Sequence, residues 1–168
     1  MPGTMAAKAV KDFTPMNKLV VILLFAITLS ACEKDSVNGN ADFFTPVQVN
    51  IAINLSLPNA APLSVPQGYI YEFGGNKGII IYRTIYNEYV AFDRTCPNNP
   101  TDACSFVSMD NSNAFYRCGQ YLPGWTPCCN SKFDPATGGV LEGAAKRALK
   151  QYFVRQDGTM LYINSNPF

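Results

Sequence analysis

The residues best suited to chemistry in this chain are its six cysteines, because histidine is absent from all 168 residues. The cysteines are Cys32, Cys96, Cys104, Cys118, Cys128 and Cys129. Without histidine, neither His-based acid–base catalysis nor imidazole metal ligation is available anywhere in the chain. Zinc knuckles use paired Cys-x-x-Cys spacings, and no such pair occurs here, so the spacing argues against a zinc site.

The first cysteine follows an apolar N-terminal segment. Met16-Asn17-Lys18 precedes the run LVVILLFAITLSAC, which has the basic start, short apolar centre and small-residue end of a secretory signal. The run is too short to span a membrane comfortably. Leu29-Ser30-Ala31-Cys32 resembles the bacterial lipobox, whose cysteine is diacylated and becomes the new N-terminus. We therefore expect a signal peptide at 16–31 after an upstream extension at 1–15, with Cys32 as lipid anchor.

The chain after Cys32 indicates a tether and a location. Residues 32–44 are polar and turn-rich, which predicts a lipidated tether that ends at a domain of residues 45–168. Glu33, rather than Asp, follows the anchor, and by the sorting rule of Gram-negative lipoproteins this favours the outer membrane. Asp35-Ser36-Val37 resembles the O-glycosylation site of Bacteroidetes. The expected partner is thus the membrane, in an oxidising compartment where cysteines tend to pair.

Composition and periodicity predict one all-β domain. The formal charge of +1 gives no basic excess for nucleic-acid binding, and the chain is rich in Tyr (9) and Phe (11). Period-two or apolar runs predict strands in 47–55, two in 78–93 that reverse near Asn87, and a pair in 104–117 that reverses through 110–113. Asp157-Gly158 between two apolar runs predicts a tight hairpin.

Two cysteine segments resemble the loops of Rieske domains, which have the patterns Cys-x-His…Cys and Cys-Pro-x-His-Gly-Ser-x-Phe-Asp. RTCPNNPTDAC (Arg94–Cys104) stands where the first loop should be, and TPCCNSKFD (Thr126–Asp134) where the second should be. Residues in register are Phe133, Asp134, Gly138, Gly143, Ala145, Leu149 and Tyr152. The resemblance implies a small antiparallel β sandwich with a cysteine-containing loop subdomain. It also implies extended or irregular chain at Gly143–Gln151, where local propensity favours helix.

The ligands of a Rieske centre are largely replaced. Such a centre holds one iron with two Cys and the other with two His. By the resemblance, Cys96 matches the first Cys, Asn98 the first His, Thr126 the second Cys and Cys129 the second His. Amide and hydroxyl groups are poor ligands for an iron–sulfur core. Cys118 would add a third thiol if Gly119–Trp125 is an insertion after a displaced ligand. We therefore expect no cofactor and no metal, with an atypical Cys-ligated [2Fe–2S] cluster as the alternative.

The same resemblance implies disulfides. With Cys32 lipidated, five cysteines remain, so at most two intrachain disulfides form. Many Rieske domains cross-link their two cluster loops through one extra cysteine in each, and Cys104 and Cys128 match those positions. Cys96 would then pair with either Cys118 or Cys129, since the loop tips lie together. A bond between Cys128 and Cys129 is disfavoured by the strain of its ring.

Three functions follow from these patterns. The first is a lipid-anchored envelope protein that is not an enzyme and acts as a structural or interaction domain. The chain also resembles a group of Rieske-like Bacteroidetes lipoproteins that lack the histidines, a resemblance that implies no defined role. The second is electron transfer through an all-Cys cluster. The third is thiol–disulfide chemistry at an unpaired cysteine such as Cys129, with Lys132 as the nearby cation that would lower its pKa. We expect the first, because the site that would have assigned a redox function is missing.

Overall fold

The structure is a computed structural model that describes residues 47–121 and 124–168. The expected extension, signal peptide, lipid anchor Cys32 and tether lie outside these residues, and they stay predictions. Within the described ranges, no helix is both long and apolar enough to cross a membrane.

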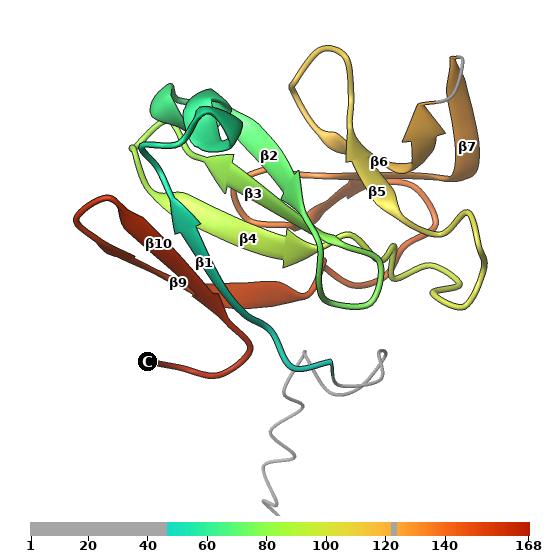
Figure 1. Cartoon of the computed structure of the whole chain (residues 1–168). Helices are drawn as coiled ribbons and strands as arrows, with labels where there is room; N and C mark the ends of the chain where they lie inside the picture. The colour runs from blue at the N-terminus through green and yellow to red at the C-terminus, as the bar shows by residue number, and fades with distance from the viewer. Residues whose placement is uncertain (1–46, 122–123) are drawn as a thin grey trace, which may run out of the picture. The chain divides into compact units, whose positions relative to one another are not determined.

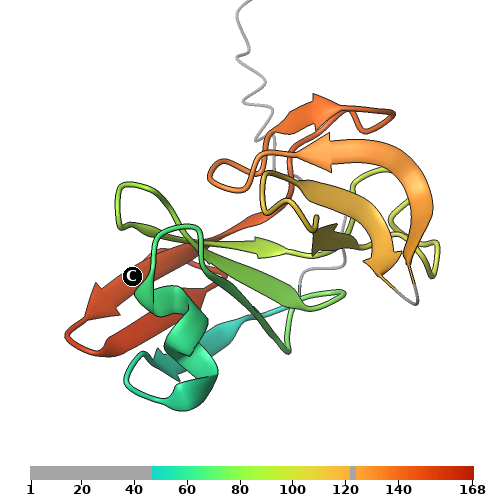
Figure 2. The same ribbon diagram turned by 90° about the horizontal axis from the view of Figure 1, so that it is seen from above.

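The described residues form ten β-strands and one 3₁₀ helix, η1. The elements are β1 (Asn50–Asn54), η1 (Pro58–Ser64), β2 (Tyr69–Glu72), β3 (Ile79–Arg83), β4 (Tyr89–Asp93), β5 (Val107–Met109), β6 (Tyr116–Tyr121), β7 (Trp125–Phe133), β8 (Val140–Glu142), β9 (Gln151–Asp157) and β10 (Met160–Asn164). One sheet has the strand order β1-β10-β9-β4-β3-β2 and the other the order β5-β6-β7-β8 (Figures 1 and 2). All the neighbouring strands are antiparallel, which confirms the predicted all-β fold.

Strand β3 contains three consecutive isoleucines because both of its faces are covered. Ile79 and Ile81 point into a first core that η1, β1 and β10 also line. Ile80, one residue out of phase, points into a second core that includes Tyr116, Phe133 and other residues of the four-stranded sheet. Since side chains alternate along a strand, one isoleucine run serves both cores. The second core also contains Cys96 and Cys118.

The hairpins predicted from the sequence are present. Strands β3 and β4 reverse at Asn87, which has the positive φ of 64°, and β5 and β6 form the predicted pair. In the β9–β10 hairpin Asp157 pairs with Met160, so the two loop residues are Gly158 and Thr159. The turn therefore starts one residue later than an Asp-Gly loop would, with Gly158 at a φ of 56°.

Three segments differ from or refine the sequence predictions. Residues 58–64, for which the sequence patterns predicted no strand, form η1, which begins at Pro58 where a missing N–H does no harm. The segment TPCCNSKFD, expected to be a loop, lies in strand β7. The cysteine-containing subdomain is thus built on the four-stranded sheet. Residues 143–150 are irregular and Gln151 begins β9, as the resemblance implied.

Candidate functional site

The first cysteine segment follows β4 and is held by buried hydrogen bonds. Asp93, at the end of β4, accepts hydrogen bonds from the Thr95 backbone N–H at 2.9 Å and from the Tyr152 hydroxyl at 2.7 Å. The backbone N–H of Cys96 donates to the Ser105 carbonyl at 3.1 Å. The Ser105 hydroxyl donates in return to the carbonyl oxygens of Cys96 and Asn98, at 3.2 and 2.7 Å. These contacts fix the backbone at Cys96, whose side chain is fully buried.

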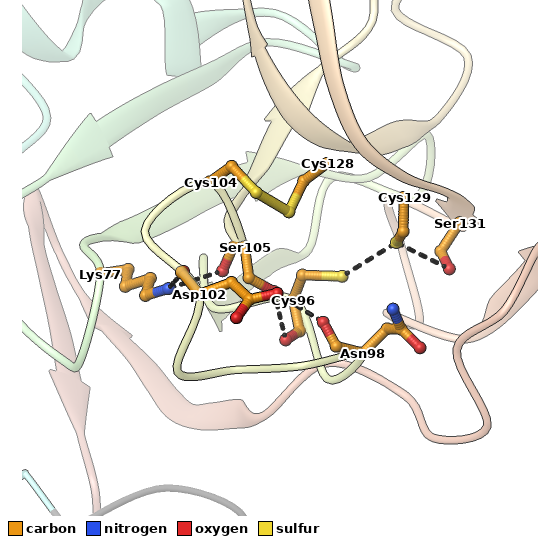
Figure 3. Close-up of a disulfide and its surroundings, with 9 residues drawn as sticks. All are labelled: Lys77, Cys96, Asn98, Asp102, Cys104, Ser105, Cys128, Cys129 and Ser131. Atoms are coloured by element: carbon orange, nitrogen blue, oxygen red, sulfur yellow. Dashed lines mark hydrogen bonds between the residues drawn. A yellow bond between two sulfur atoms is a disulfide. The ribbon is translucent and has the colours of Figure 1, made fainter.

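Lys77 adds a second set of contacts to this segment (Figure 3). Its ammonium group donates to the backbone carbonyls of Asp102 and Ser105, the latter at 3.1 Å. An ammonium ion bound to carbonyl oxygens forms stronger hydrogen bonds than a neutral donor does. Lys77 therefore holds the C-terminal part of the 96–105 segment, whose N-terminal part is held by the hydrogen bonds of Cys96.

A large β-bulge positions the second cysteine segment. Arg117 of β6 pairs with Lys132 of β7, and the next pair along the two strands is Gly119 with Pro127. Cys118 alone therefore faces the four residues 128–131 of β7. A bulge leaves the extra residues unpaired with the neighbouring strand and redirects their side chains. This is how two consecutive cysteines of one strand can face different partners.

Cys128 forms a disulfide with Cys104 across the two segments, with their Cα atoms 5.3 Å apart. This is the pairing that the resemblance implied. The next residue, Cys129, instead directs its sulfur toward Cys96, and Figure 3 shows the two arrangements side by side. The Sγ atoms of Cys96 and Cys129 are 3.6 Å apart.

Cys118 completes a cluster of three thiols with Cys96 and Cys129. The three Sγ atoms all lie within 4.8 Å of one another. Cys96 and Cys118 are fully buried, and Cys129 is half-buried. The expected second disulfide, from Cys96 to either partner, is not formed, because 3.6 Å is a contact between sulfur atoms and not a bond. We call these three residues the thiol cluster.

The thiol cluster favours one thiolate. The pKa of Cys96 is lowered to about 6, chiefly by a hydrogen bond from the Cys118 thiol. Hydrogen bonds from the Asn98 backbone and from Cys129 also lower the pKa, whereas burial raises it. The pKa of Cys118 is raised, because its proton is held by the hydrogen bond to Cys96 and because burial disfavours its charged form. Deprotonation is therefore favoured at Cys96 and opposed at Cys118.

Ser131 supports the cluster from β7. Its hydroxyl oxygen lies 3.2 Å from the Cys129 sulfur and accepts a hydrogen bond from the Ala145 backbone N–H at 2.9 Å. This contact requires the chain at Gly143 to pass close to β7. A Cβ on Gly143 would lie 2.3 Å from the Asn130 carbonyl oxygen, and the residue has a φ of 103°. Glycine is needed at this position for both reasons.

The four positions that the resemblance assigned to cluster ligands are only partly brought together. Cys96 and Cys129 meet, whereas Thr126 is exposed on β7, opposite Gln120. The backbone carbonyl of Asn98 accepts a hydrogen bond from Ser105. Cys118, which had no matching position, takes part instead. Its place in the cluster depends on the β6–β7 bulge, for which the sequence carries no local signal.

Two further sequence expectations concern this region. The first was that Cys118 would add a third thiol if Gly119–Trp125 is an insertion; Gly119–Tyr121 end β6, Trp125 begins β7, and the Cys118 sulfur lies in the thiol cluster. Lys132 was the cation expected to lower a thiol pKa. Its ammonium group is instead 2.6 Å from a Glu142 carboxylate oxygen and 5.1 Å from the centre of the Phe115 ring.

The donor set does not fit a [2Fe–2S] cluster. Such a cluster needs two protein ligands on each of its two irons. Among the described residues, the group of candidate ligands at these segments consists of three thiols, and the chain has no histidine to add. Two of the five body cysteines, Cys104 and Cys128, are used by the disulfide.

Comparisons with known proteins concern the fold. No family model matches the chain, and no curated protein matches it. A similar solved structure is the cyanobacterial plasma membrane Rieske protein PetC3 from Synechocystis PCC 6803, 23% identical with a TM-score of 0.48, covering 68% of this chain and 97% of that one. Another is the quaternary ammonium Rieske monooxygenase CntA, 16% identical with a TM-score of 0.46, covering 71% of this chain and 31% of that one.

A third similar structure is the ferredoxin of carbazole 1,9a-dioxygenase from Nocardioides aromaticivorans IC177. It is 15% identical with a TM-score of 0.40, covering 72% of this chain and all of the other. These identities and TM-scores assign the chain neither a family nor a cofactor or activity. The described residues form an all-β fold of two antiparallel sheets.

Proposed function

We propose that this protein is a lipid-anchored envelope protein whose Rieske-like domain carries no [2Fe–2S] cluster and acts as a structural or interaction domain. One observation carries the proposal. Of the positions that match the ligands of a Rieske centre, Cys96 and Cys129 meet, whereas Thr126 is exposed on β7. The disulfide from Cys104 to Cys128 holds the two segments together, but it is a bond that cluster-binding Rieske domains can also contain.

The chemistry of the side chains supports the same conclusion. Three thiols do not supply the two ligands per iron that the cluster requires. Asn98 and Thr126, at two of the ligand positions, offer an amide and a hydroxyl, which bind iron–sulfur cores poorly. Electron transfer through an atypical cluster is therefore the alternative, and it would need a fourth ligand from another source.

The membrane attachment is supported by the sequence alone. Leu29-Ser30-Ala31-Cys32 follows an apolar run of signal-peptide length, and a polar segment separates Cys32 from β1. Diacylation provides the two acyl chains that stable anchoring requires. A Cys32→Ala variant is expected to lose incorporation of labelled palmitate and to leave the membrane fraction, whereas the unchanged chain retains both. Equal labelling of the two chains would remove the anchor from the proposal.

Iron and acid-labile sulfide analysis tests the missing cluster. The whole chain, expressed with its own signal and purified anaerobically in detergent, is expected to be colourless and to contain neither iron nor sulfide in stoichiometric amount. A reconstituted Rieske protein handled in parallel shows that the procedure preserves clusters. Two irons and two sulfides per chain, lost in a Cys129→Ser variant, would establish the electron-transfer alternative.

A further inference from the structure

The spacing of the thiol cluster matches the coordination sphere of a single metal ion. A metal–sulfur distance of about 2.3 Å in a tetrahedral site places neighbouring sulfurs about 3.8 Å apart. In the structure one sulfur pair is 3.6 Å apart and all three sulfurs lie within 4.8 Å. We propose that Cys96, Cys118 and Cys129 bind one thiophilic d¹⁰ metal ion, Zn²⁺ or Cu⁺, as three thiolate ligands. This inference goes beyond the proposed function, because it assigns a binding site to a domain proposed to lack its cluster.

The donor set selects the class of ion. Thiolates are soft ligands that favour Cu⁺ and Zn²⁺, whereas Mg²⁺ and Ca²⁺ require oxygen donors. The group of converging ligand atoms contains sulfur only, with no carboxylate among its members. A single ion also needs no more than these three protein ligands, because Cu⁺ accepts three and Zn²⁺ completes its sphere with an exogenous fourth ligand.

The ligands come from three separate parts of the fold. Cys96 lies after β4, Cys118 lies on β6, and Cys129 lies in the β7 bulge. Cys96 is held through Ser105, and Cys129 is in contact with Ser131, which is itself held by Ala145. Partners of this kind orient metal ligands and raise the affinity of a site. The disulfide beside the cluster keeps the two segments together whether or not an ion is bound.

Access to the cluster is through Cys129. A pocket of about 190 Å³ is lined by Cys129 together with Arg117, Asn130, Ser131, Lys132 and Glu142. The other two thiols are fully buried, so an ion would arrive from this pocket, and a fourth ligand would face it. Both cations that line the pocket are paired with carboxylates, Arg117 with Asp110 at 3.2 Å and Lys132 with Glu142 at 2.6 Å.

Metal titration of the purified whole chain tests the proposal. Zn²⁺ is measured by competition with a chromophoric chelator, Cu⁺ by competition with bicinchoninate, and Co²⁺ by its thiolate charge-transfer bands. We expect one ion per chain, with cobalt bands typical of tetrahedral sulfur ligation. Each of the variants Cys96→Ser, Cys118→Ser and Cys129→Ser should weaken binding by at least about 100-fold, since even outer-shell partners are worth 10- to 100-fold.

Matched controls separate this site from others. Ser112→Ala, in the exposed β5–β6 turn, should bind like the unchanged chain, and so should Cys32→Ser. Cys129→Ser is the decisive variant, because its half-buried side chain makes unfolding less of a risk than at the two fully buried positions. Preferential Cu⁺ binding identifies copper as the ion, and preferential Zn²⁺ binding identifies zinc.

A second measurement does not depend on any variant. Saturating Zn²⁺ or Cu⁺ should protect Cys96, Cys118 and Cys129 of the unchanged chain from alkylation, as read by mass spectrometry after proteolysis. The proposal is overturned if neither ion binds, or if binding and protection persist unchanged in Cys129→Ser. Failure of this test leaves the iron and sulfide test unaffected, because a chain without any metal satisfies the proposed function.

Discussion

Removal of the Cys104–Cys128 disulfide should destabilise the domain by an amount that follows from its position in the chain. The two residues are 24 positions apart, so the bond closes a loop of about 25 residues in the unfolded chain. For such a loop the chain-entropy relation gives about 3.5 kcal/mol at 25 °C. Cys104 is exposed and Cys128 is half-buried, so replacement by serine removes little packing in addition.

Urea unfolding of a Cys104→Ser, Cys128→Ser double variant measures this loss. A domain of this size has an unfolding slope of about 1–3 kcal/mol per M, so the midpoint should fall by roughly 1–3.5 M. The double variant is preferable to either single one, which would leave a new thiol beside Cys129. Because a typical domain has only about 5–15 kcal/mol of stability, the effect is large but leaves a folded protein.

Reduction provides the matched control. A reductant should lower the midpoint of the unchanged chain to that of the double variant, and it should leave the double variant where it is. A loss below about 1 kcal/mol would refute the reasoning, because it would mean that the disulfide does not restrict the unfolded chain. A reductant effect that persists in the double variant would show that another disulfide is present.

Three further perturbations test the neighbourhood of the cluster. Gly143→Ala should destabilise the domain by roughly 1–3 kcal/mol or more in thermal melting, because its Cβ would lie 2.4 Å from the Ser131 Cα. The control Gly158→Ala should show a smaller loss, because a Cβ on Gly158 meets nothing within 4 Å. Tyr152→Phe removes a hydrogen bond to buried Asp93 and should lower the free energy of unfolding by about 1–3 kcal/mol, whereas the control Tyr162→Phe should stay within about 0.5 kcal/mol. The third perturbation is pH, with a chelator present to keep metal ions away. The pKa of Cys96 is about 6 in the folded chain and 9.0 for an ordinary cysteine, so the Cys96 thiolate contributes fully to stability above pH 9 and this contribution is lost as the pH falls through 6. The free energy of unfolding should therefore rise from pH 6 to 8.5, by at most about 1.4 kcal/mol per pH unit, and a Cys96→Ser variant that keeps the full slope would contradict this.

Local patterns in the sequence were sufficient for much of the fold. Residues 47–55 alternate because one face of the strand is buried, and residues 79–82 are continuously apolar because both faces are buried. Asn87 and Gly158 have the positive φ angles that their residue types allow in turns. The disulfide between Cys104 and Cys128 followed from family resemblance, since spacing alone leaves many pairings open.

The resemblance named Cys118 as a conditional third thiol, but local patterns in the sequence did not place it. Cys118 joins the thiol cluster only because the β6–β7 register skips residues 128–131, and a register shift depends on long-range pairing. The Cys-x-x-Cys spacing, whose absence indicated no zinc site, detects ligands on a single turn and misses ligands that come from three parts of a fold. Thr126 had a plausible position in the motif, yet it is exposed on β7.

Disulfide mapping tests the central claim most directly. The whole chain, purified without reductant or metal, is denatured, alkylated and digested before mass spectrometry. The account predicts one cross-linked peptide pair, Cys104 with Cys128, and full alkylation of Cys96, Cys118 and Cys129. A cross-link between any two of those three, or a Cys104 that is alkylated, would contradict it.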